Sequence, residues 1–273
     1  GESEVSMINS AQGNPVEVSP DTATLIKKGL YYGKLSNGAF DITIGAVSSL
    51  WDFKSEDPAP PDTAAIAAAL THVNYKKVVV ERNTVTLQDP AAALDLGAVA
   101  KGYIADRLKD YLKGEGVHHA LINLGGNVLA VGDKPDGSPF HIGIQKPFDE
   151  SGIPLTSVRI DDKSIVTSGT YQRYFEKDGT LYHHILDPAS GYPCNNGLAS
   201  VSIITDSSLT ADALSTTCFL LGPEKGLSLV NQLDNVEAVF VDTDNQITYS
   251  NNFQKEKSPS CGAVNTEAPC VRG

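Results

Sequence analysis

The sequence predicts an α+β fold with mixed, largely antiparallel sheets and packed helices, and three observations support this prediction. Strand-like and helix-like segments do not alternate regularly along the chain, as they would in a doubly wound parallel sheet. Two pairs of short strands are joined by tight turns at 82–83 and 177–179, the pattern of antiparallel hairpins. The middle of the chain, from 120 to 167, holds several strand-like segments in succession.

Three helical signals lie in the first half of the chain. Residues 19–21 combine an N-cap, a proline at the first helical position and an acid in the first turn. Asp62 is the start of a second helix, and a third begins after Gly97 and stops at Gly114. Residues 38–45, between the first and second predicted helices, are predicted to be extended. The side of the third helix that faces the core is expected to carry Val99, Ile104, Leu108 and Leu112.

The other elements are mostly strands with apolar, β-branched residues between turn signals. Two helices are expected in the last third of the chain, at 210–221 and after the Gly-Pro-Glu cap at 222–224. The predicted strands are 77–81, 84–87, 120–123, 128–131, 141–145, 157–160, 164–167, 199–205, 236–241 and 246–249, with a hairpin around 177–179.

Composition restricts the classes of function. The formal net charge is −12 and no run of Lys or Arg occurs, which argues against nucleic acid as a partner. A small anionic ligand would need a local cation or a metal against this overall charge. No apolar run approaches the ~20 residues of a membrane span. The absence of an initiator Met and of a signal peptide suggests a trimmed or partial chain.

The four cysteines do not form a metal-binding pattern, because none lies in a C-x-x-C pair. Cys218 lies in an apolar run and is expected to be a small buried side chain. Cys261 and Cys270 could form a disulfide, within residues 254–273, which lack periodicity and are expected to be a tail or linker. The predicted domain therefore covers 1–253.

His184 lies where a predicted strand runs into a tight turn with the sequence Asp-Pro-Ala-Ser-Gly-Tyr-Pro. A histidine at the rim of a sheet can reach both water and substrate, and its ordinary pKa lets it accept a proton near neutral pH. A structural hydrogen bond is the commoner role for such a residue, so this signal alone is weak.

Residues 95–102 form a turn of small residues that opens a helix, where backbone can approach a phosphate closely. Lys101 would add a positive charge, and Asp95 could accept a hydrogen bond from a ligand. An ordinary strand-to-helix turn explains the same residues. The Gly pair at 125–126 and the hydroxyl-rich segment 167–170 have equally common structural explanations, as a turn and as backbone capping.

Asp212 and Thr216 are four residues apart near the start of a predicted helix and so project from one face. A carboxylate, a hydroxyl and a nearby carbonyl are oxygen ligands of the kind that Mg²⁺ prefers. The alternative is that Asp212 interacts with the helix dipole and that Thr216 packs or bonds to its own backbone.

Taken together, these segments resemble the motifs of the FAD:protein FMN transferase family, the ApbE-type flavin transferases. The matching sequences include Gly-Ala-Phe-Asp-Ile-Thr-Ile-Gly, Asp-Leu-Gly-Ala-Val-Ala-Lys-Gly-Tyr and His-Ile-Leu-Asp-Pro-x-x-Gly-x-Pro. The resemblance spans roughly 6 to 253, with seven motifs in the family's order: 38–45, 50–53, 95–103, 123–127, 167–169, 184–193 and 211–216.

The resemblance implies a role for particular residues. His184 matches the general base, whereas His183 does not match a functional position. The magnesium ligands are expected to be Ala98, through its carbonyl, with Asp212 and Thr216; Ser215 stands where some members have a second acid. The residues that match FAD-binding positions are Ala39, Phe40, Asp41, Asp95, Lys101 and Ile185.

The activity implied is Mg²⁺-dependent transfer of FMN from FAD to a Thr or Ser hydroxyl of an acceptor flavoprotein, through a phosphoester bond and with release of AMP. Two alternatives stay open: a Mg²⁺-dependent FAD pyrophosphatase that gives FMN and AMP, and a non-catalytic flavin-binding protein. The family usually carries additional N-terminal strands with a Met-Gly-Thr segment, which this chain lacks. Its members commonly act outside the cytoplasmic membrane, held there by an N-terminal segment, and the same location is expected here.

Overall fold

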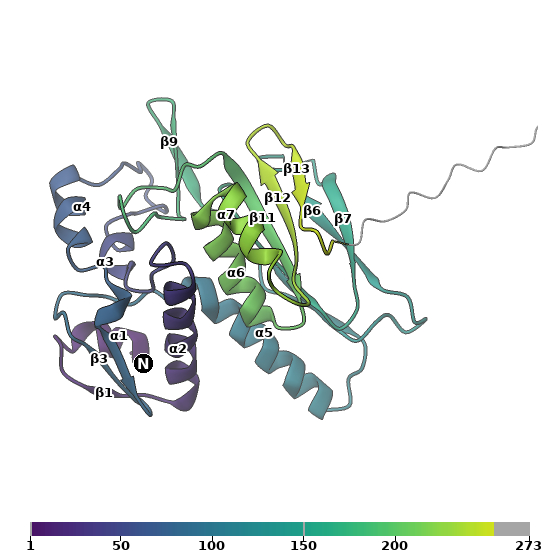
Figure 1. Cartoon of the computed structure of the whole chain (residues 1–273), viewed down its shortest axis with the longest axis horizontal. Coiled ribbons are helices and arrows are strands. Elements are labelled where there is room, and N and C mark those ends of the chain that lie inside the picture. The colour runs from purple at the N-terminus through teal and green to yellow at the C-terminus, as the bar shows by residue number, and fades with distance from the viewer. Residues whose placement is uncertain (1, 150, 254–273) are drawn as a thin grey trace, which may run out of the picture.

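A computed structural model describes residues 2–149 and 151–253 and shows the predicted α+β architecture, with a mainly helical N-terminal part beside a large antiparallel sheet (Figure 1). The helices are α1 (Glu4–Ser10), α2 (Pro20–Leu35), α3 (Gly45–Ser48), α4 (Thr63–Leu70), α5 (Gly97–Gly114), α6 (Ser208–Leu221) and α7 (Pro223–Val230), with a 3-10 turn η1 (Tyr75–Lys77). The strands are β1 (Val16–Glu17), β2 (Val78–Glu81), β3 (Thr84–Leu87), β4 (Ala120–Asn123), β5 (Asn127–Val131), β6 (Phe140–Gln145), β7 (Pro154–Ile160), β8 (Ser164–Gly169), β9 (Tyr174–Lys177), β10 (Thr180–His183), β11 (Leu198–Thr205), β12 (Glu237–Asp242) and β13 (Ile247–Tyr249).

Every pairing between these strands is antiparallel, which confirms the predicted pairing mode. The main sheet has six strands in the order β13-β12-β11-β8-β5-β4. Three smaller sheets accompany it: β1-β3-β2, the β9–β10 hairpin and the β6–β7 hairpin. Both hairpins predicted from turn residues, at 82–83 and 177–179, are present.

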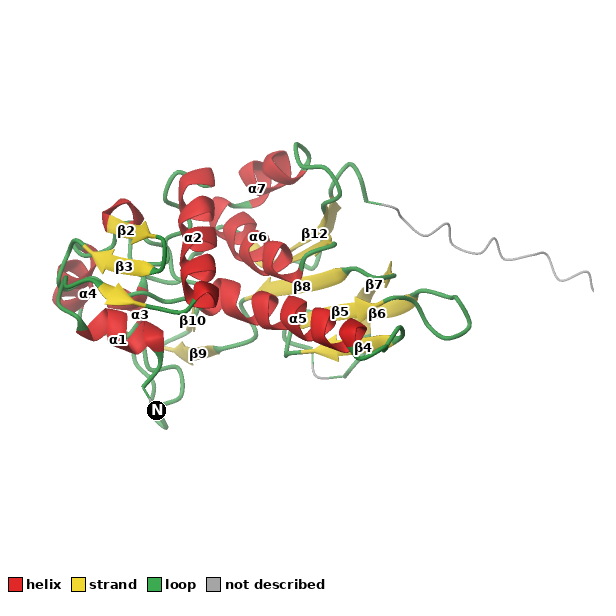
Figure 2. Ribbon diagram, turned by 90° about the horizontal axis from the view of Figure 1, so that it is seen from below, coloured by secondary structure: helices red, strands yellow, loops and turns green. Residues whose placement is uncertain are grey.

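The main sheet is covered on both faces because successive residues of a strand point to opposite sides. In β8, Ile165 belongs to a core shared with the β6–β7 hairpin, whereas its neighbour Val166 belongs to the core shared with the helices. The same division separates Ile203 from Ile204 in β11. Figure 2 shows α5 and α6 lying side by side over one face of this sheet.

Helices α5 and α6 pack closely because the residues between them are small. A β-carbon at Gly102 would lie 2.3 Å from the carbonyl oxygen of Ser208, so only glycine allows this approach. Asp106, one turn further along α5, accepts hydrogen bonds from the backbone N–H groups of Ser208 and Leu209 at 2.7 and 3.0 Å. These contacts fix the start of α6 against α5.

The predicted core-facing side of α5 is wrong in part. Ile104 and Leu108 are 51% and 38% exposed, and the buried residues are Val99, Gly102 and Ala105. The prediction followed large apolar side chains, but the helix turns its small residues toward α6 because close packing requires them there.

Residues 38–45 are also not extended as predicted; they form successive turns that lead into α3. The Asp41 carboxylate accepts hydrogen bonds from the backbone N–H and the hydroxyl of Thr43, at 2.8 and 2.6 Å, and so folds the chain back on itself. The short elements α1, α3 and β1 were not predicted.

Other predictions concern the cysteines and the end of the chain. Cys218 is buried and unpaired, as expected, and Cys194 is also a free thiol. The predicted tail at 254–273, with Cys261 and Cys270, lies outside the described residues. Within the described ranges, no helix is both long and apolar enough to cross a membrane.

Candidate active site

A cavity of about 280 Å³ lies where the N-terminal part meets the main sheet. All the predicted site residues except Ala39 line it. They come from two kinds of structure. We call Ala98, Lys101, Asp212 and Thr216 the helix wall, because they lie on α5 and α6; we call Phe40, Asp41, Asp95, His184 and Ile185 the turn wall, because they lie in turns.

The helix wall is organised by the close packing of α5 and α6. The backbone N–H of Gly102 donates to Oδ2 of Asp212 at 2.8 Å. In an α-helix the same N–H faces the carbonyl four residues earlier, which is that of Ala98. The Gly102 amide therefore joins Asp212 of α6 to α5, one helical turn after Ala98.

Hydroxyl groups continue this wall. Ser168 Oγ, at the end of β8, lies 3.0 Å from Thr216 Oγ1 and 2.8 Å from Ser215 Oγ. The Ser215 hydroxyl also donates to the backbone carbonyl of Asp212 at 2.9 Å. Ser215 occupies the position where some family members have a second acid. Its hydroxyl is engaged with its own helix and with β8.

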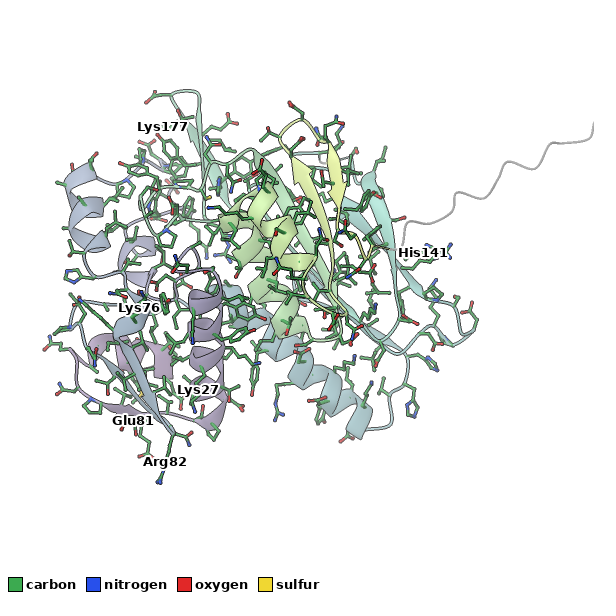
Figure 3. The ribbon with its side chains drawn as sticks, in the orientation of Figure 1. Lys27, Lys76, Glu81, Arg82, His141 and Lys177 are labelled. Carbon is green, nitrogen blue, oxygen red and sulfur yellow. The ribbon has the colours of Figure 1, made fainter. Side chains whose placement is uncertain are left out.

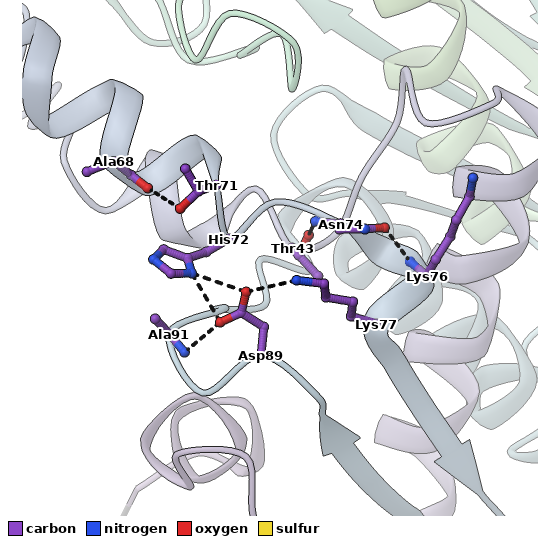
Figure 4. A network of polar contacts seen from close by, with 9 residues as sticks. All are labelled: Thr43, Ala68, Thr71, His72, Asn74, Lys76, Lys77, Asp89 and Ala91. Carbon is purple, nitrogen blue, oxygen red and sulfur yellow. Dashed lines mark hydrogen bonds and ion pairs between the residues drawn. The ribbon is translucent and has the colours of Figure 1, made fainter.

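Asp41 holds the turn wall in shape rather than presenting a free carboxylate. Besides Thr43, it accepts a hydrogen bond from the backbone N–H of Tyr75 at 2.8 Å. Thr43 in turn accepts from the backbone N–H of Asn74 at 2.8 Å, a contact drawn in Figure 4. All of these groups are buried or half-buried, so the turn is fixed by hydrogen bonds from side chains to backbone.

The same part of the molecule is anchored at Asp89, just after β3. Figure 4 shows its carboxylate between the His72 ring, at 3.1 Å, and Lys77 Nζ, at 3.3 Å. The hydrogen bond from His72 is the main cause that lowers the pKa of Asp89. This network supports the turn wall from outside and does not reach the cavity.

Asp95, like Asp41, has a structural role, because both of its carboxylate oxygens accept hydrogen bonds within the protein. Oδ1 accepts from the backbone N–H of Gly97 at 2.8 Å, and Oδ2 accepts from the Ser48 hydroxyl at 3.0 Å. Its own N–H donates to the Ile42 carbonyl at 2.7 Å. Asp95 therefore joins the start of α5 to the turn that carries Phe40 and Asp41.

His184 comes directly after β10, at the junction that the sequence predicted. Its Nδ1 lies 3.3 Å from the carbonyl oxygen of Arg173, and its backbone N–H donates to the same carbonyl at 3.1 Å. A carbonyl only accepts, so Nδ1 carries the proton and Nε2 has a free electron pair. The neighbouring His183 is buried against the Phe219 ring and accepts from the Ile185 N–H at 3.3 Å, which is a structural role.

The electrostatic surroundings keep His184 neutral. Burial is the main cause that lowers its pKa from 6.5 to about 4, and the guanidinium of Arg173 is the next. Burial acts in the opposite direction on Asp212 and raises its pKa, while the Gly102 N–H and Lys101 oppose this effect. The free cavity thus contains a neutral imidazole and a carboxylate whose negative charge is poorly solvated.

The helix wall fits a divalent cation. A backbone carbonyl, a carboxylate and a hydroxyl are hard oxygen ligands, and a cation would offset the poor solvation of Asp212. Among the described residues there is no cluster of three or more His, Cys, Asp or Glu side chains that could form a metal site on its own. A cation here would have to rely on the mixed set of Ala98, Asp212 and Thr216.

An aromatic cluster closes one end of the cavity. Trp51 and Phe53 both line it, and their rings stack with centroids 5.7 Å apart. The Trp51 indole N–H donates to the carbonyl of Gly191 at 3.1 Å, in the turn after His184. Phe175 and Tyr182 pack against the same ring, so the turn and the β9–β10 hairpin are held together.

Several cavity residues had no predicted role: Ser48, Gln172 and Arg173. For Arg173 the sequence held a usable signal. In a hairpin with its tip at 177–179, counting outward in register pairs His183 with Tyr174, and the next position pairs His184 with Arg173. Ser48 and Gln172 left no comparable signal.

Comparison with known proteins gives the family of the chain. The sequence profile described as the ApbE family matches residues 1–240. A FAD:protein FMN transferase from Klebsiella pneumoniae is 42% identical over 261 residues, covering 94% of this chain and 81% of that protein. One from Treponema pallidum is 36% identical, covering 91% of this chain and 73% of that protein.

Solved structures agree with the fold as well. The ApbE protein of Thermotoga maritima superposes with a TM-score of 0.83 at 33% identity, covering 91% of this chain and 82% of that one. The flavin transferase ApbE of Vibrio cholerae gives 0.78 at 30% identity, with 91% and 81% covered. The fold is thus that of flavin transferases. The chain belongs to the ApbE family.

Proposed function

We propose that this protein is an enzyme that transfers FMN from FAD to a Thr or Ser hydroxyl of an acceptor protein, in a Mg²⁺-dependent reaction that releases AMP. The observation that supports it most directly is that His184, Lys101, Asp212 and Thr216 all line one cavity. These are a base, a cation and two oxygen ligands, as transfer of a phosphoryl-linked group requires.

The reaction balances without any further reactant. The acceptor hydroxyl oxygen forms a bond to the phosphorus on the FMN side of the pyrophosphate. The bond from this phosphorus to the bridging oxygen breaks, and the bridging oxygen leaves with AMP. The product is a phosphoester between the acceptor and FMN, and the hydroxyl proton passes to the protein.

His184 is the group that accepts this proton, through Nε2. The Arg173 carbonyl holds Nδ1 and so presents the free electron pair of Nε2. With a pKa of about 4, the imidazole is neutral at physiological pH and available to accept a proton. Bound pyrophosphate brings negative charge close to the ring, which raises this pKa and makes the imidazole a better base in the complex.

The helix wall provides for the negative charge of the pyrophosphate. Lys101, whose Nζ donates to the carbonyl of Gly125 at 3.2 Å, contributes a positive charge at the cavity. The Ala98 carbonyl, Asp212 and Thr216 would hold Mg²⁺. When bound, this ion neutralises the phosphate oxygens and stabilises the leaving group.

The turn wall binds the rest of FAD. Ala39, Phe40, Asp41, Asp95 and Ile185 are the contacts proposed for it. The carboxylates of Asp41 and Asp95 are occupied by hydrogen bonds inside the protein, so they act on FAD mainly by fixing the backbone around it. Ala39 does not line the cavity in this structure, unlike its neighbour Phe40.

The experiment that tests the proposal is an intact-mass measurement on a flavin-acceptor protein incubated with FAD, Mg²⁺ and this enzyme. A transferase adds one FMN to each acceptor and releases an equal amount of AMP. Release of AMP without a change in acceptor mass would identify a FAD pyrophosphatase instead. Binding of FAD with neither product would identify a carrier.

The metal assignment has its own test, in a magnesium titration of the transfer rate. Asp212→Ala removes the only carboxylate of the proposed ligand set, so we expect the half-saturating Mg²⁺ concentration to rise at least about tenfold. Thr216→Ser, which keeps a hydroxyl, serves as the matched control and should stay close to the parent. Identical curves for Asp212→Ala and the parent would show that the metal is not bound there.

A further inference from the structure

A second cavity, of about 490 Å³, adjoins the site on the side of the β6–β7 hairpin. Four residues line both cavities: Lys101, Thr167, Gln172 and Arg173. Among the described residues, Lys101 and Arg173 are the only Lys or Arg side chains that line either cavity. The positive charge available to a ligand is therefore concentrated where the two cavities meet.

The position of Arg173 is fixed by the fold, although its side chain is exposed. Arg173 comes directly before β9 and lies opposite His184, which directly follows β10. The carbonyl of Arg173 accepts both the backbone N–H and the Nδ1 proton of His184. The guanidinium is thus carried by the same residue that orients the proposed base.

Nothing in the described part of the chain neutralises this guanidinium. No carboxylate there forms an ion pair with Arg173. The nearby carboxylates of the cavity are engaged elsewhere: Asp41 with Thr43 and Tyr75, Asp95 with Gly97 and Ser48, and Asp212 with Gly102. In a chain with a net charge of −12, an unpaired arginine at a cavity is available for an anion from outside.

We propose that the Arg173 guanidinium binds the pyrophosphate of FAD, together with Lys101, at the junction of the two cavities. This inference rests on the proposed function and adds a residue to it. Guanidinium presents its N–H groups in a fixed fork that suits two phosphate oxygens at once, whereas Lys101 acts as a point charge. Arg173 is then a catalytic residue, because it touches the group that reacts.

The position of Arg173 beside His184 links the binding of phosphate to proton transfer. In the free protein the guanidinium disfavours protonation of His184. A phosphate bound to Arg173 neutralises that charge, so the imidazole becomes a stronger base once the substrate is in place. The same residue therefore binds the phosphate and makes the activation of the base depend on it.

The test compares the binding of ADP and of adenosine, which differ in the pyrophosphate, to the complete protein at fixed Mg²⁺ by calorimetry or competition. For Arg173→Gln we expect ADP to bind about ten- to a hundredfold more weakly, as for the loss of charged hydrogen bonds, and adenosine to bind as before. Arg173→Lys should recover part of the ADP affinity, since it keeps the charge and loses the fork.

Arg82→Gln is the matched control, because Figure 3 shows Arg82 at the tip of the β2–β3 hairpin, pointing away from the molecule. It should bind both ligands as the parent does. Unchanged ADP binding by Arg173→Gln would overturn the proposal. An equal loss for ADP and adenosine would also overturn it, because Arg173 would then shape the cavity rather than bind phosphate.

The test separates this inference from the proposed function. If the parent itself binds neither FAD nor ADP, both proposals fail. If the parent binds ADP and transfers FMN while Arg173→Gln does so equally well, only the role of Arg173 fails. A melting curve for each variant excludes unfolding as the cause of weaker binding.

Discussion

The two walls of the candidate active site are built in different ways. The helix wall takes its geometry from backbone packed against backbone: α5 approaches α6 at Gly102, and this approach brings the Gly102 N–H to the Asp212 side chain. The turn wall takes its geometry from side chains that hold backbone: Asp41 fixes one turn, and Asp95 joins that turn to the start of α5.

This difference has a consequence for mutation. A contact between two backbones cannot adjust, so a single added methyl group on the helix wall must move a whole helix. A hydrogen bond from one side chain can be lost while its neighbours remain, so the turn wall should weaken in steps. The proposed chemistry is also divided, with the proposed base on the turn wall and the proposed oxygen ligands on the helix wall.

The largest expected effect concerns this division of the chemistry. His184→Ala should lower the rate of FMN transfer about 10²- to 10⁴-fold, the range for loss of a general base, and leave FAD binding nearly unchanged. A stopped assay of flavin fluorescence on the denatured acceptor measures the rate, and quenching of free flavin measures the binding. Transfer at the parent rate would remove His184 from the mechanism.

The packing of the helix wall is tested by a pair of glycines on the same helix. Gly102→Ala should destabilise the protein by about 1–3 kcal/mol, because the new β-carbon meets the backbone of Ser208 and Leu209. It should also lower transfer, since Asp212 is displaced. Gly114→Ala adds its β-carbon where no atom lies within 4 Å, so thermal unfolding should show little change. Equal stability of the two variants would contradict the proposed rigidity.

A smaller effect is expected from the turn wall. Asp41→Asn turns one of the accepting oxygens into a donor and leaves a backbone N–H or the Thr43 hydroxyl without its partner. Such a loss costs about 1–3 kcal/mol for a buried group, and chemical denaturation should show a value in the lower half of this range. FAD affinity should fall less than tenfold. A complete loss of folding would mean that the turn does not weaken in steps.

A separate effect concerns pH dependence. His183 and His184 both have a pKa of about 4 in the folded protein, below the ordinary 6.5, so folding favours their neutral forms. The unfolded chain binds more protons between these values, and stability should therefore be full above pH 6.5 and decline as the pH falls toward 4. Thermal melts across this range measure it; a stability that rises on acidification would contradict both shifts.

The pH dependence of the transfer rate tests the lowered pKa of His184 in a second way. The acid limb of kcat/KM reports the free enzyme and should lie near pH 4, whereas the limb of kcat reports the complex and should lie at higher pH, because phosphate raises the pKa of His184. Coincident limbs would mean that the bound phosphate does not reach the imidazole.

Regular elements and their pairing were predictable from the sequence because they follow from spacing and capping. The N-cap at Ser19, the turn at 82–83 and the stop at Gly114 all act within a few residues, and the structure has each of them. The class of fold followed from the same local signals.

What failed depends on contacts between distant residues. Burial of Gly102 in place of Ile104 on α5 is decided by α6, more than a hundred residues later in the chain. The turn at Asp41 needs the backbone of Tyr75 as well as that of Thr43. Spacing gave the face shared by Asp212 and Thr216, but only the fold shows that His184 lines the same cavity.

The most direct test of the proposed site is a crystal structure of the protein with ADP and Mg²⁺. We expect one pyrophosphate between the two walls, with Lys101 and Arg173 on its oxygens, the ion on Asp212 and Thr216, and Nε2 of His184 turned toward a phosphorus. A pyrophosphate bound away from the helix wall, or an ion held by other residues, would contradict it.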